Sequence, residues 1–145
     1  MNLSTESSKD SPSWSNALLL GIQEIDNQHK IFVSLLDKVS SINMEEDNKE
    51  TILPLLEELQ RYSVYHFNSE EALMRKANAP DMDRHIKQHE LFKKKCDEFV
   101  IAYNYNNKML VEQMLLFMRK WLIIHISDID SNYAESVKSY LAIPQ

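Results

Sequence analysis

Residues 85–103, HIKQHELFKKKCDEFVIAY, carry the pattern that decides the fold. Apolar side chains and two histidines recur there at alternating intervals of four and three residues. This interval places them on one face of an α-helix. The positions on that face are His85, His89, Phe92, Cys96, Phe99 and Tyr103. The stretch therefore predicts a helix whose buried face begins with a pair of histidines.

Three other stretches repeat the same interval. They carry His29, Phe32, Leu36 and Val39; then Ile52, Leu55, Leu59, Tyr62, His66, Glu70 and Leu73; and then Val111, Met114, Met118, Leu122 and His125. Short polar breaks separate the four stretches, at residues 43–48, 77–81 and 104–108. Four helices with short connections predict an all-α, up-down-up-down four-helix bundle.

The ends of the chain differ from these helices. Residues 1–13 are polar and serine-rich, which predicts a flexible N-terminal tail. Trp14–Ile25 is apolar without a clear helical period and predicts a packed N-terminal arm. Residues 133–141 are compatible with a short extra helix at the C-terminus. We therefore expect one domain over residues 14–145.

Pro54 leaves the start of the second helix open. If that helix begins near Thr51, the proline falls in the first turn, where its missing N–H costs little. If it begins near Asn48, a kink is expected.

Composition excludes several classes of function. The chain carries a net charge of −6 and no evident basic face, so we expect no nucleic-acid partner. Gly21 is the single glycine, which removes every glycine-rich phosphate loop. One cysteine allows no intramolecular disulfide. Neither a signal peptide nor an apolar run long enough for a membrane is evident, so we expect no membrane insertion and a cytoplasmic location.

All five histidines extend the apolar faces of the predicted helices. Unpaired imidazoles in a core would leave polar nitrogens unsatisfied, and bound metal removes that cost. Residues four apart on a helix lie about 40° apart around its axis and about 6 Å apart along it, so such a pair can hold one ion. His85 with His89 is one such pair, and His66 with Glu70 is another. Glu71, five residues after His66, points away from it.

The fourth helix offers two acids after His125. Asp128 has the better helical phase, because Asp130 lies about 140° around the axis from His125. Asp130 reaches the site only if the helix widens, bends or ends near residues 126–129. A π-type turn is one way to achieve this, and such turns often mark functional sites. Spacing alone does not choose between the two acids.

The motifs GIQEIDNQH (residues 21–29), HFNSEEALM (66–74), HIKQHELF (85–92) and WLIIHISDIDSNY (121–133) together resemble the hemerythrin family, and the Trp14 arm resembles its bacteriohemerythrin branch. The resemblance extends from Trp14 to about Tyr133. It implies two non-haem iron ions with an oxo or hydroxo bridge. One iron would bind His85, His89 and His125, and the other His29 and His66. Glu70 and Asp130 would bridge the two.

This ligand set implies a coordination count. Five histidines, two bridging carboxylates and one bridging oxygen leave one of the positions on two six-coordinate irons open, on the iron held by His29 and His66. Such a position is what a small ligand needs. The set is also richer in nitrogen than that of ferritin-like di-iron enzymes, whose Glu-x-x-His motif is absent from this chain.

By the same resemblance the chain reversibly binds O₂ and small anions such as azide, as a carrier, store or local supplier rather than an enzyme. Tyr133 would form a hydrogen bond near the bridging aspartate. Three alternatives stay open: an O₂ or redox sensor that acts through an unknown protein partner, an enzyme that reduces peroxide, NO or O₂, and a purely structural bundle with or without zinc. The apolar residues matching the family's O₂ pocket are Phe32, Phe67, Trp121, Leu122 and Ile126.

Overall fold

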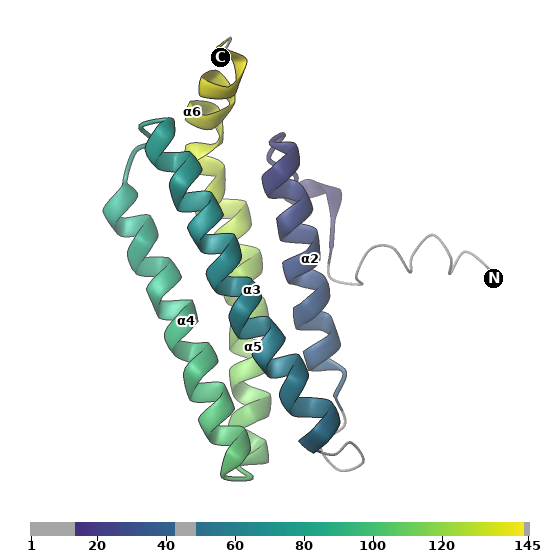
Figure 1. The fold of residues 1–145 in the computed structure, drawn as a ribbon. Helices are drawn as coiled ribbons and strands as arrows, with labels where there is room; N and C mark the ends of the chain where they lie inside the picture. The colour runs from purple at the N-terminus through teal and green to yellow at the C-terminus, as the bar shows by residue number, and fades with distance from the viewer. Residues whose placement is uncertain (1–13, 43–48, 144–145) are drawn as a thin grey trace, which may run out of the picture.

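The computed structural model describes residues 14–42 and 49–143. Within these ranges the chain forms helices and no strands (Figure 1). The predicted tail over residues 1–13 and the predicted break over residues 43–48 lie outside the described residues. Four long helices make up the bundle: α2 (Gln23–Ser40), α3 (Lys49–Lys76), α4 (Met82–Asn104) and α5 (Lys108–Ile124).

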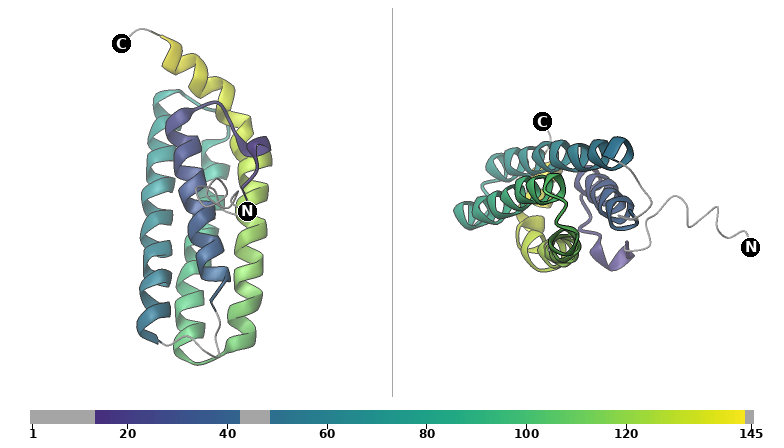
Figure 2. Two further views of the ribbon diagram at one scale, coloured as in Figure 1. Left: turned by 90° about the vertical axis from the view of Figure 1, so that its right-hand side faces the viewer. Right: turned by 90° about the horizontal axis from the view of Figure 1, so that it is seen from below.

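Each long helix packs against its neighbours in a closed ring. Helix α3 contacts α2 and α4, and α5 contacts α4 and α2. Figure 2 shows this ring along the bundle axis. Successive helices run in opposite directions because their connections are short, so the predicted up-down-up-down bundle is confirmed.

Three shorter helices complete the part of the chain that the structure describes. A 3₁₀ turn, η1 (Asn16–Leu18), lies in the N-terminal arm, and a π-helix, η2 (His125–Asp130), follows α5 without a break. Helix α6 (Ser131–Ala142) continues from η2 and extends the column formed by α5 (Figure 1). The predicted C-terminal helix is therefore present and begins two residues earlier than predicted.

The N-terminal arm is fixed by the first turn of α2. The carboxylate of Asp26 accepts hydrogen bonds from the backbone N–H groups of Leu20 (2.8 Å) and Gly21 (3.1 Å). Gly21 adopts φ +86°, a left-handed conformation that a residue with a Cβ rarely takes. Leu18 and Leu20 are buried, as expected for a packed arm. The arm ends earlier than predicted, because α2 already begins at Gln23.

Pro54 is the sixth residue of α3 and lies in its second turn, past the first turn where a proline costs least. The described start of α3 at Lys49 agrees with the alternative in which the helix begins near Asn48, and the kink expected with that start stays a prediction. None of the described helices is both long enough and apolar enough to cross a membrane.

The core consists of two clusters stacked along the bundle. The larger includes Phe32 and Phe67, and the smaller includes Ile25 and Met74. These four side chains are at most 1% exposed, and complete burial of an apolar side chain of this size contributes about 1.5–3 kcal/mol. Helices α2 and α3 pass from one cluster to the other, and their histidines lie at that junction. The packing therefore holds the candidate site rigidly from both sides.

Candidate metal centre

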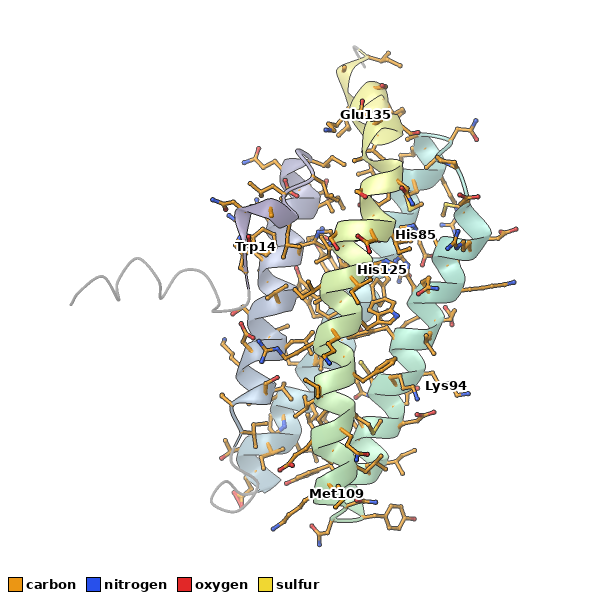
Figure 3. The ribbon with its side chains drawn as sticks, turned by 180° about the vertical axis from the view of Figure 1, so that it is seen from behind. Trp14, His85, Lys94, Met109, His125 and Glu135 are labelled. Atoms are coloured by element: carbon orange, nitrogen blue, oxygen red, sulfur yellow. The ribbon has the colours of Figure 1, made fainter. Side chains whose placement is uncertain are left out.

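The seven predicted ligands meet inside the bundle, and each is at most 4% exposed. They form two groups that share one acid. The first group is Glu70, His85, His89, His125 and Asp130, and the second is His29, His66 and Glu70. Figure 3 labels His85 and His125, which lie between α4 and the end of α5 with ring centres 4.9 Å apart. The five histidines come from α2, α3, α4 and η2, so all four columns of the bundle contribute.

Glu70 divides its two oxygens between the two groups. Oε1 lies 3.1 Å from Nε2 of His85 and 2.9 Å from Nε2 of His89. Oε2 lies 3.5 Å from Nε2 of His29 and 3.6 Å from Nε2 of His66. One carboxylate therefore faces both groups at once.

Asp130 divides its oxygens in the same way. Oδ1 lies 2.9 Å from Nε2 of His85 and 3.0 Å from Nε2 of His125, whereas Oδ2 lies 3.2 Å from Nε2 of His29. The π-helix η2 makes this possible, because its wider turn brings the side chains of His125 and Asp130 to the same side. Asp128 is exposed and accepts a hydrogen bond from the neighbouring Ser127 hydroxyl (3.2 Å). The wide turn thus places Asp130, and not Asp128, among the histidines.

Several buried polar atoms of this cluster form no hydrogen bond among the described residues, although most of them lie within ion-pair distance of an opposite charge. They are both ring nitrogens of His29 and His125, Nε2 of His89, and both oxygens of Asp130. Buried polar atoms in folded proteins are nearly always paired, because an unpaired one costs about 1–3 kcal/mol. A bound metal would satisfy the Nε2 atoms and the carboxylate oxygens among them, so the cluster fits a metal site.

The spacing of the donor atoms fits as well. Around an octahedral ion with bonds of about 2.1 Å, ligand atoms at right angles lie about 3 Å apart. The seven nitrogen–oxygen distances here run from 2.9 to 3.6 Å. Imidazole and carboxylate donors suit first-row transition metals, including iron. The residues present therefore form two adjacent groups compatible with metal binding, and Glu70 belongs to both.

Without metal, the histidines of the cluster differ in pKa. Burial lowers the pKa of His29 and of His85, but Asp130 and Glu70 outweigh it and raise both to about 9. Burial dominates at His66 and lowers its pKa to about 4. Burial opposes ionisation of Glu70 and Asp130, yet the histidines hold both carboxyl pKa values below their usual range. The metal-free site is thus a network of buried ion pairs.

Two residues in contact with the cluster were not predicted from the sequence. The Nδ1–H of His66 donates to Oε1 of Gln28 (2.8 Å), and the Nδ1–H of His89 donates to Oε2 of Glu71 (2.7 Å). From the sequence, Glu71 is a candidate ligand only beside His66. Its hydrogen bond is instead with His89, which lies on another helix, α4. Gln28 lies four residues before Phe32, on the same face of the helix, and this spacing was the signal in the sequence that could have found it.

Tyr133 forms a hydrogen bond with a candidate ligand, in keeping with the outer hydrogen bond that the resemblance implied. Its hydroxyl donates to Oε2 of Glu70 at 2.7 Å, and the resemblance had named no acceptor beyond placing the tyrosine near Asp130. The side chain is 1% exposed. The π-turn carries the tyrosine past Asp130, so its hydroxyl reaches across to α3.

Three of the five residues predicted to line an O₂ pocket pack against the histidines, and all five belong to or pack against the larger core cluster. Phe67 stacks on His89 with ring centres 4.0 Å apart, and Trp121 stacks on His125 at 4.5 Å. Phe32 contacts His66 edge-on at 5.6 Å. The side chains that belong to the core here are Phe32, Phe67, Leu122 and Ile126, with Trp121 packed against them. The wall beside the site is therefore apolar, and its role in O₂ binding stays a prediction.

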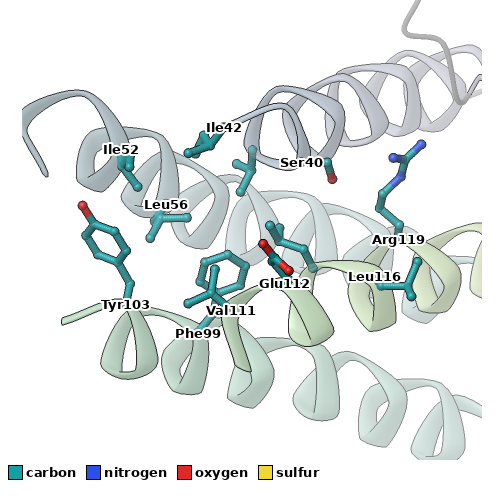
Figure 4. A pocket seen from close by; sticks show the side chains of 12 residues that line it. Ser40, Ile42, Ile52, Leu56, Phe99, Tyr103, Val111, Glu112, Leu116 and Arg119 are labelled. Carbon is teal, nitrogen blue, oxygen red and sulfur yellow. The ribbon is translucent and has the colours of Figure 1, made fainter. Parts of the chain in front are cut away.

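A separate pocket of about 290 Å³ lies at the other end of the bundle (Figure 4). The ends of α2 and α4 and the starts of α3 and α5 form its walls. Residues such as Ile52, Phe99 and Val111 line it, and none of the candidate metal ligands does.

Comparison with known proteins agrees with this geometry. Residues 20–136 match the family model of the hemerythrin HHE cation-binding domain. A bacteriohemerythrin from Pseudomonas aeruginosa is 30% identical over 125 residues, which cover 86% of this chain and 80% of that protein. A bacteriohemerythrin from Clostridium acetobutylicum is 28% identical and is covered to 98%.

Solved structures show the same fold. A crystal structure of wild-type hemerythrin superposes with a TM-score of 0.76 at 25% identity, covering 86% of this chain and 96% of that one. The match of one family model to most of the chain, and of relatives over 80% and 98% of their length, shows that this protein belongs to the hemerythrin family.

Proposed function

We propose that this protein reversibly binds O₂ at a non-haem di-iron centre and serves as an oxygen carrier, store or local supplier. One observation carries the proposal: two buried carboxylates each turn one oxygen toward a three-histidine group and the other toward a two-histidine group. Two bridging carboxylates with five imidazoles form a nitrogen-rich site for a pair of iron ions. When bound, the iron pair would supply the electrons that O₂ binding needs.

The protein's own residues provide an unequal pair of sites. The group of His85, His89 and His125 offers three nitrogens, whereas the group of His29 and His66 offers two. His29 and His66 would hold their iron with fewer protein donors than the other group provides, and would therefore leave room there for O₂. Azide, a small anion, is expected at the same iron.

The apolar wall supports binding rather than turnover. Phe32, Leu122 and Ile126 are at most 1% exposed and carry no group that could donate or accept a proton. General acid–base catalysis needs such a group within hydrogen-bonding reach of the substrate. The Tyr133 hydroxyl is already engaged with Glu70. We therefore propose a binding protein and not an enzyme, located in the cytoplasm.

The test is iron analysis combined with visible spectroscopy. The purified protein, reduced with dithionite under argon and then exposed to air, is expected to hold two irons per chain. Its absorption should change on oxygenation and be restored by removing O₂. An oxygen electrode with excess reductant and added peroxide distinguishes the alternatives: a carrier consumes neither steadily, whereas an enzyme does. Fewer than two irons, or steady consumption, contradicts the proposal.

A further inference from the structure

Two ligand histidines carry a side-chain hydrogen bond on the nitrogen that faces away from the site, and their acceptors differ in charge. The Nδ1–H of His89 donates to the carboxylate of Glu71, and the Nδ1–H of His66 donates to the amide oxygen of Gln28. The two bonds are nearly equal in length, 2.7 and 2.8 Å. One belongs to the three-histidine group and the other to the two-histidine group.

The remaining contacts do not cancel this difference. Among the residues described, no hydrogen bond reaches Nδ1 of His29 or of His125. Glu71 and Gln28 are 8% and 6% exposed, so water screens neither bond well. Arg75 approaches the other oxygen of Glu71 at 3.7 Å, but its side chain is 60% exposed, and it neutralises the carboxylate only in part.

A charged acceptor and a neutral one affect a metal ligand differently. A histidine that donates its outer N–H to a carboxylate becomes a more basic ligand at its other nitrogen. Hydrogen bonds with an ionised partner are roughly twice as strong as neutral ones. The more electron-rich imidazole stabilises the higher charge on its metal ion. With a carboxylate behind His89 and an amide behind His66, the ferric state is favoured in the three-histidine group over the two-histidine group.

We propose that Glu71 is a positioning residue that makes the ion of the three-histidine group the easier one to oxidise, while Gln28 leaves the ion of the two-histidine group the harder one. The proposal rests on the proposed function, because it needs two redox-active irons. The step concerned is the one-electron reduction of a ferric ion to a ferrous ion, with dithionite as the electron donor. In a half-reduced protein the ferric ion lies beside His89 and the ferrous ion beside His66.

Exchanging the two acceptors tests the proposal, since glutamate and glutamine have the same shape. The variants are Glu71→Gln, which removes the charge behind His89, and Gln28→Glu, which adds one behind His66. Glu90→Gln is the matched control: Glu90 adjoins His89 in sequence, but it pairs with Lys93 (2.7 Å) and is 62% exposed. Each iron-loaded protein is titrated with dithionite under argon and followed by visible absorption, with iron quantified in parallel.

Glu71→Gln is expected to ease reduction at least tenfold in the equilibrium constant, or ~59 mV for one electron. Gln28→Glu is expected to lower the reduction potential. Glu90→Gln is expected to shift the potential by less than half of the shift in Glu71→Gln. If Glu71→Gln binds iron too weakly to titrate, Gln28→Glu decides alone, because it adds an acceptor instead of removing one.

The outcomes separate the two levels of the argument. A wild-type protein without two reducible irons contradicts the proposed function itself. A wild-type protein that cycles, together with swap variants that hold two irons and titrate as wild type does, overturns this inference alone. A Glu90→Gln shift as large as that of Glu71→Gln also overturns it, because the effect would then come from overall charge and not from the hydrogen bond.

Discussion

Replacing Asp130 by asparagine tests whether the π-helix serves the site. The substitution keeps the size of the side chain and removes its charge. In the metal-free protein the carboxylate lies 2.9–3.2 Å from the Nε2 atoms of His29, His85 and His125. Its pKa stays below the usual range despite the neighbouring Glu70, so attraction to the histidines outweighs repulsion between the two acids.

The expected loss of stability can be worked out from this geometry. Removing one partner from a buried ion pair costs about 3–5 kcal/mol. A chain of 145 residues unfolds with an entropy of about 0.3 kcal/mol/K, at about 2.1 cal/mol/K per residue. The melting temperature of metal-free Asp130→Asn should therefore fall by roughly 10–16 °C. Asp128→Asn is the matched control. Its exposed side chain should change stability by less than about 0.5 kcal/mol, or about 2 °C.

Circular dichroism melts of the chelator-treated proteins measure the change in melting temperature. Iron analysis after reloading measures the change in iron binding. Loss of a shared ligand should weaken iron binding by more than the roughly 10–100-fold that loss of an outer hydrogen-bond partner causes. An Asp130→Asn protein that melts within about 2 °C of wild type and keeps its iron would refute the reasoning. Equal damage from Asp128→Asn would refute it too.

Three further predictions concern the core, the metal-free site and the thiol. Leu122→Ala should lower the free energy of unfolding by about 2–5 kcal/mol, because Leu122 is 1% exposed. The cavity should admit water, so the spectrum of the oxygenated protein should decay faster at full iron loading. An unchanged decay rate would mean that Leu122 only packs the core. In the metal-free protein, folding raises the pKa of His29 and His85 to about 9 and lowers that of His66 to about 4. The stability contributed by His29 and His85 is complete below about pH 6.5 and is lost as the pH rises toward 9. The stability contributed by neutral, buried His66 is lost as the pH falls from about 6.5 toward 4. The urea midpoint of unfolding should therefore be highest near pH 6.5, and a midpoint that rises steadily to pH 9 would contradict this. Burial raises the pKa of the Cys96 thiol to about 12, so it should react with a disulfide reagent at pH 8 only after denaturation, and rapid reaction in the folded protein would be inconsistent with its 3% exposure.

The helical period was enough to predict the bundle. Apolar residues at intervals of three and four, such as Phe92, Cys96 and Phe99, must lie on one face of a helix, and four such faces bury each other only as a bundle. The periods also carried the histidines inward, so the grouping of His85 with His89 followed from regular helix geometry.

Regular geometry could not place Asp130. An α-helix puts Asp128 closer to His125, and only the wider turn of η2 reverses that order. Family resemblance, not spacing, favoured Asp130. Sequence also says little about contacts between helices. For this reason the bond from His89 to Glu71 was missed, and the acceptor of the Tyr133 hydroxyl, Glu70, could not be named. The start of α3 relative to Pro54 was likewise undetermined, because either register keeps the same buried face.

The central claim is that two ions share Glu70 and Asp130 between two groups of histidines. Anomalous diffraction from crystals of the iron-loaded protein, recorded at the iron absorption edge, tests it most directly. The account predicts two iron peaks in the bundle. One would be bound by His85, His89 and His125 and the other by His29 and His66, with each carboxylate contributing one oxygen to each iron. A single peak, or two peaks that share neither carboxylate, would contradict it.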